Sequence, residues 1–116
     1  MHNTYITLSK DQWIQVISKA DELKDNDIYM FILRSLANSQ QVSYFSIAAY
    51  NKEFIGDQEH VGRSNNIFIS QITKIVNSVL EERLDNDLSW YVWHTKDKSW
   101  VIGWESFINL QKAFKV

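Results

Sequence analysis

Apolar residues recur at helical spacing in two segments of the N-terminal third of the chain. The first segment follows Ser9 and Gln12, whose spacing is that of a capping box, and is expected to continue to about residue 23. Its apolar stripe consists of Trp13, Val16, Ile17, Ala20 and Leu23. Residues 28–38 are apolar on nearly every side, so this second helix should form the buried centre of the fold.

The central part of the chain has a less definite pattern. Residues 42–50 combine β-prone residues with an Ile-Ala-Ala run, and both a strand and a helix remain open. Residues 51–66 contain two of the three glycines and are interpreted as a long loop. From about 67 to 84 a continuous apolar stripe predicts a long helix, and the opposite face of this helix is polar.

Four of the five tryptophans lie between residues 89 and 104. Two β-prone runs flank residues 95–98, which predicts a β-hairpin, and a short helix over about 105–114 should follow it. Both faces of the hairpin carry apolar side chains, although a hairpin that packs on one side only should have a polar outer face. The surplus aromatic residues are therefore either covered by another element or form a contact surface.

The composition is that of a globular protein, and the predicted helices and C-terminal hairpin indicate one α+β domain over residues 1–116. The chain has no cysteine, which excludes disulfides and thiolate metal sites. No signal peptide and no apolar run long enough to cross a membrane are recognised, so we expect a cytoplasmic protein with no membrane association.

The sequence contains no recognisable catalytic motif. Its three histidines lie at 2, 60 and 94 without helical pairing, and a phosphate-binding glycine loop is absent. Asp57, Glu59 and His60 form a local cluster, but adjacent charged residues are more typical of a solvated surface. We therefore expect a non-catalytic protein without metal or cofactor that binds a macromolecule.

The charge distribution is more informative than the net charge of −2. Residues 61–80 contain no acidic residue, and the turn of the predicted hairpin carries Lys96 and Lys98. The order of predicted elements, helices followed by a long helix and a hairpin, resembles a winged helix. This resemblance implies a small DNA-binding accessory or regulatory protein of the phage or plasmid type, with duplex DNA as its partner. The residues expected to contact bases or phosphates are Arg63, Gln71, Thr73, Lys74, Asn77, Lys96 and Lys98.

A protein-binding inhibitor is the alternative, either a toxin-immunity protein or an antagonist of a host defence enzyme. Its contact surface would consist of Tyr91, Trp93 and His94, because tryptophan and tyrosine are enriched in protein interfaces. The sequence leaves open whether the chain forms a homodimer.

Overall fold

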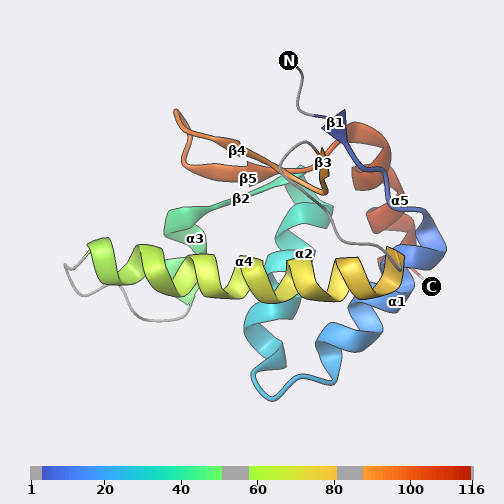
Figure 1. The fold of residues 1–116 in the computed structure, drawn as a ribbon, viewed down its shortest axis with the longest axis horizontal. Helices are drawn as coiled ribbons and strands as arrows, with labels where there is room; N and C mark the ends of the chain where they lie inside the picture. Colours follow the sequence, from blue (N-terminus) through green and yellow to red (C-terminus); the bar gives the residue numbers. More distant parts are fainter. Residues whose placement is uncertain (1–3, 51–57, 81–87, 116) are drawn as a thin grey trace.

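The structure is a computed structural model that describes residues 4–50, 58–80 and 88–115, with side chains for 6–50, 67–80 and 89–115. Its fold is of the α+β class, as predicted (Figure 1). In chain order the elements are β1 (Thr4–Tyr5), α1 (Lys10–Asp21), α2 (Asn26–Ser39), β2 (Gln41–Ser43), α3 (Tyr44–Tyr50), α4 (Gln58–Leu80), β3 (Leu88–Ser89), β4 (Val92–His94), β5 (Ser99–Val101) and α5 (Trp104–Phe114).

The predicted capping box begins α1. The Gln12 amide donates to Ser9 Oγ at 3.1 Å, and the Ser9 amide donates to Gln12 Oε1 at 2.8 Å. Both bonds satisfy backbone N–H groups that a helix start otherwise leaves unpaired. Leu8 and Trp13, the flanking apolar pair, are completely buried.

The centre of the fold is α2, as its apolar sequence predicts. It packs against α1 and α5 on one side and against β2 and α3 on the other (Figure 1). The completely buried side chains Ile32, Leu33 and Leu36 lie on this helix, whereas Arg34 and Asn38 remain exposed. Figure 1 shows α4 crossing in front of α2 along the longest dimension of the molecule.

Two small sheets complete the fold. The predicted hairpin is formed by β4 and β5, and β2 pairs with the other side of β5, giving the antiparallel order β2-β5-β4. Val42, Trp100 and Trp93 are directly opposite one another across the three strands. A separate parallel pair joins β1 to β3, which is therefore not part of the hairpin.

The structure decides one interpretation that the sequence left open and corrects one prediction. Residues 42–50 contain both proposed elements, because β2 ends at Ser43 and α3 begins at Tyr44. The loop predicted for 51–66 is wrong over 58–66, where α4 has already begun; residues 51–57 lie outside the described part. Gly62 weakens helix formation by about 1 kcal/mol, which a helix of this length tolerates. Residues 58–66 are mainly polar, so no apolar stripe in the sequence indicated that the helix begins at Gln58.

The N-terminal segment is attached to α5 by two buried hydrogen bonds and one half-buried one. The Leu8 amide donates to Ser106 Oγ at 3.0 Å, and Trp13 Nε1 donates to the Ser106 carbonyl at 3.0 Å. Asn109 Nδ2 donates to the Leu8 carbonyl at 2.9 Å. These contacts join residues almost a hundred positions apart, so α1 and α5 form one packed unit. Among the described residues, no helix combines the length and the apolar character that crossing a membrane requires.

Candidate functional site

The outer face of α4 is the first candidate surface. Ile67, Ser70, Lys74 and Ser78 form an exposed stripe at intervals of three or four residues. Ile69, Ile72 and Val76 occupy the opposite side of the helix and are buried in the core. Of the residues predicted to read bases, Gln71 and Asn77 are half-buried at the margins of this stripe.

Thr73 contributes to the core and not to the exposed stripe. Its hydroxyl donates to the Ile69 carbonyl at 2.9 Å and accepts from Trp90 Nε1 at 2.9 Å. The Trp90 indole is completely buried, so its N–H needs a partner inside the protein. The structure therefore gives Thr73 a packing role, and we leave it out of the proposed DNA contact.

Replacing the Thr73 hydroxyl should test this packing role. Thr73→Val keeps the shape of the side chain but leaves the Trp90 N–H without its acceptor, and we expect a loss of about 1–3 kcal/mol in unfolding free energy. Thr73→Ser retains the hydroxyl and is the matched control, with a smaller expected loss. Urea unfolding followed by circular dichroism measures both, and equal stability of Thr73→Val and wild type would contradict the assignment.

The turn between β4 and β5 carries a cluster of exposed charged groups. Lys96 and Lys98 are exposed, and Lys98 Nζ lies 5.8 Å from the centre of the Phe45 ring. His94 Nδ1 lies 4.0 Å from Asp97 Oδ2, with both side chains open to solvent. Lys98 has a φ of 49°, in the left-handed region, where a residue with a Cβ is less stable than glycine.

The predicted DNA-binding residues do not all lie in one region. Figure 1 shows the β4–β5 turn at the same end of the molecule as the N-terminal part of α4. Arg63 belongs to that part of α4, although its side chain lies outside the described residues. Lys74 lies in the C-terminal part of α4, which Figure 1 shows extending to the other end of the molecule. Lys74 is therefore separated from the hairpin lysines along the helix axis.

Two of the three residues of the alternative contact surface lie together, whereas His94, the next residue after Trp93 on β4, is exposed and does not line the same hollow. Tyr91 and Trp93 line one hollow of about 380 Å³, whose other lining residues are Tyr44 and Trp100. Trp93 is 41% exposed, and its ring centre lies 4.8 Å from that of Trp100, which is 4% exposed. Burial raises the pKa of the Tyr91 phenol, so the phenol stays neutral at physiological pH. The hollow has aromatic walls, and no acidic side chain lines it.

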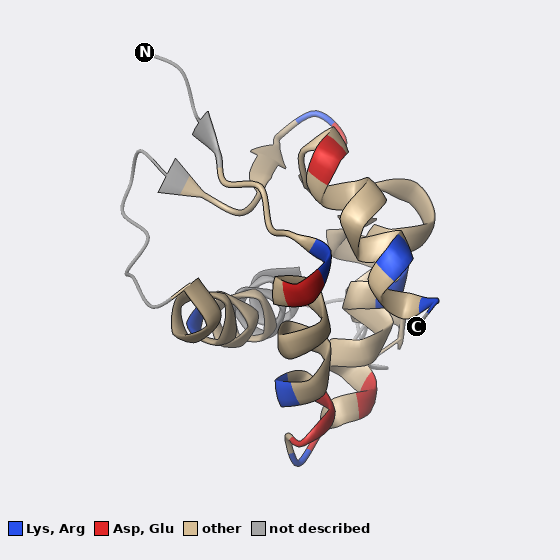
Figure 2. Ribbon diagram, turned by 90° about the vertical axis from the view of Figure 1, so that its right-hand side faces the viewer, with Lys and Arg blue, Asp and Glu red and all other residues tan. Residues whose placement is uncertain are grey.

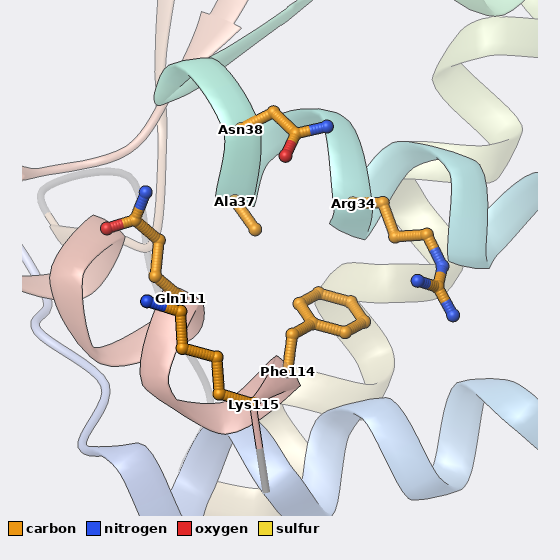
Figure 3. A pocket seen from close by; sticks show the side chains of 6 residues that line it. All are labelled: Arg34, Ala37, Asn38, Gln111, Phe114 and Lys115. Carbon is orange, nitrogen blue, oxygen red and sulfur yellow. The ribbon is translucent and has the colours of Figure 1, made fainter.

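A second hollow lies between α2 and α5 (Figure 3). Arg34 and Lys115 contribute two cations to its lining, and the Arg34 guanidinium carbon lies 5.1 Å from the centre of the Phe114 ring. Figure 3 shows the Arg34 guanidinium and the Lys115 amine on opposite sides of that ring. Because the two cations do not converge on one point, this hollow offers no defined anion site.

Acidic residues cluster in the sequence around the α1–α2 turn, away from the hairpin. Figure 2 shows them where α1 and α2 meet, at the lower end of the view. The exposed acidic residues there are Asp21, Glu22, Asp25 and Asp27. Within the described ranges, no three histidine, aspartate or glutamate side chains come together as a metal site would require.

Comparison of the chain with family models, with curated proteins and with solved structures found no match.

Proposed function

We propose that the protein binds duplex DNA through the end of the molecule formed by the β4–β5 turn and the N-terminal part of α4. The observation that carries this proposal is the order of the elements: α2, β2, α3, α4 and the β4–β5 hairpin, with β2 paired to the second strand of the hairpin. This connectivity resembles that of a winged helix, in which the last helix before the hairpin enters the major groove. In this arrangement α4 is the recognition helix and the β4–β5 turn is the wing.

The revised element boundaries support this resemblance. The sequence suggested that a long loop precedes the recognition helix, which departs from a winged helix. In the structure α3 ends at Tyr50 and α4 begins at Gln58, so only residues 51–57 separate the two helices. This connection is shorter than the sequence predicted, although it is longer than the turn of three or four residues that is typical of a helix-turn-helix.

The charge distribution supplies a second argument. Lys96 and Lys98 are exposed at the wing, and Arg63 adds a cation in the N-terminal part of α4. Such residues contact phosphates and set the position of a protein on the duplex. The exposed acidic residues of the α1–α2 turn lie away from the wing, at the lower edge of the molecule in Figure 1. Secondary contacts to the DNA would come from Gln71, Lys74 and Asn77, which lie farther along α4.

Binding should be weak and strongly dependent on salt. With three cations at phosphates, we expect the logarithm of the association constant to fall with the logarithm of salt concentration at a slope of about −3. Fluorescence anisotropy with a labelled duplex of mixed sequence, at several salt concentrations, measures this slope. A slope near zero, or no binding at the lowest salt concentration, would contradict the proposal. One labelled single strand of the same duplex is the control.

A further inference from the structure

The outer edge of β4 is available for another strand. The Tyr44 amide donates to the Lys98 carbonyl at 2.8 Å, and the Ile102 amide donates to the Gln40 carbonyl at 3.1 Å. Since backbone groups alternate in direction along an antiparallel strand, Trp100 faces β2 with its own N–H and C=O. The backbone N–H and C=O groups of Ser99 and Val101 consequently face β4.

The alternation determines where the backbone of Trp93 points. His94 and Val92, opposite Ser99 and Val101, direct their backbone groups towards β5. The N–H and C=O of Trp93 therefore point away from β5, towards the free edge of the sheet. Among the described residues β4 pairs with β5 alone, so this donor and acceptor are open to a partner strand.

The Trp93 side chain places an apolar hollow beside this edge. The hollow lined by Tyr44, Tyr91, Trp93 and Trp100, of about 380 Å³, falls within the range of about 300–1,000 Å³ typical of ligand sites. Trp93 thus contributes both an open backbone edge and one wall of the hollow. Peptide-binding domains that extend a sheet combine these two features, since main-chain bonds provide affinity and a side-chain pocket provides specificity.

The charges at the end of the strand indicate which peptide would fit. Beyond His94 the turn carries Lys96 and Lys98 against a single aspartate, Asp97. Its net charge is therefore positive at neutral pH. An extended segment paired with β4 would bring one of its ends close to this turn, where a carboxylate would be favoured.

We propose that the β4 edge and the adjoining aromatic hollow bind an extended peptide segment of a partner protein. The segment adds a strand antiparallel or parallel to β4, places an apolar side chain in the hollow and directs an acidic residue towards Lys96 and Lys98. This surface is distinct from the base-reading face of α4, although it shares the lysines of the turn. The peptide would therefore be a second kind of binding partner, in addition to the duplex DNA proposed above.

A displayed library of random peptides of about eight residues, selected on the wild-type chain, tests this proposal. We expect enrichment of peptides that contain an acidic residue near an apolar one. Trp93→Ala should weaken their binding by about tenfold or more, as truncation of a central interface tryptophan does. Trp104→Ala is the matched control, because Trp104 is also exposed (63%) but lies on α5. This control should bind as wild type does.

A second measurement leaves the protein unchanged. Methylation of the backbone nitrogen in a selected peptide, placed at each position in turn, should abolish binding at alternate positions, because only alternate amides bond to the strand. Failure to enrich any peptide, or equal binding by Trp93→Ala, would overturn the proposal. Binding of an oligothymidylate that is lost in Trp93→Ala would assign the hollow to base stacking instead. A wild-type dimer that Trp93→Ala dissociates would assign the edge to a second copy of this chain.

Discussion

Trp90→Ala should destabilise the protein by about 3–5 kcal/mol, the range found when a large aromatic side chain is removed from a core. Trp90 is completely buried, and its ring packs edge-on against that of Trp13, with ring centres 6.4 Å apart. Its indole N–H also bonds to Thr73 on α4. One side chain thus joins α1, α4 and the segment before β4. Urea unfolding followed by circular dichroism measures the loss.

Two variants distinguish the physical contributions of Trp90. Trp90→Phe keeps most of the apolar volume and removes the N–H, so it should cost less than the alanine variant. Trp104→Ala removes the same kind of side chain from an exposed position and should change the unfolding free energy by about 0.5 kcal/mol or less. If Trp90→Ala and Trp104→Ala were equally stable, the packing described for Trp90 would be wrong.

The local features of the fold were predictable because their causes lie within a few residues. The capping box of Ser9 and Gln12 has a defined spacing, and the apolar density of residues 28–38 indicates a central helix without any tertiary information. The hairpin was likewise recognisable from its β-prone runs around residues 95–98.

The features that failed to be predicted depend on distant parts of the chain. Residues 88 and 89 belong to the same predicted first strand as residues 92–94, yet they pair with β1 instead of β5. No local pattern specifies this choice of partner. The role of Thr73 could not be predicted for the same reason, because its polar side chain at helical spacing resembles a surface residue until Trp90 is placed beside it.

The candidate surfaces were predictable in composition but not in arrangement. The sequence assigned the hairpin lysines and Lys74 to a contact surface and left open whether the surplus aromatic residues are covered. In the structure Lys96, Lys98, Lys74 and Trp93 are exposed, whereas Tyr91 is half-buried. It could not show that α4 separates Lys74 from the turn along its axis. It also missed Tyr44 and Trp100 as walls of the hollow, because they come from elements that only the fold brings together.

Reversing the charge of the wing should strongly weaken the binding of duplex DNA. In Lys96→Glu/Lys98→Glu two phosphate contacts are replaced by repulsion, so we expect the affinity at low salt to fall by about tenfold or more. The slope of the salt dependence should become less negative by about two units. Lys74→Glu, in the C-terminal part of α4, should have a smaller effect. Lys98→Gly removes one cation and suits the positive φ at that position, so reduced binding by this variant would not reflect misfolding.

The most direct test compares this double variant with Lys19→Glu/Lys24→Glu, which makes the same change in net charge. Lys19 and Lys24 are exposed near the acidic α1–α2 turn, at the end of the molecule opposite the hairpin. Anisotropy titrations of one labelled duplex at low salt should show the loss for the wing variant and near wild-type affinity for the control. Equal affinities for the two double variants would contradict a DNA-binding surface at the β4–β5 turn.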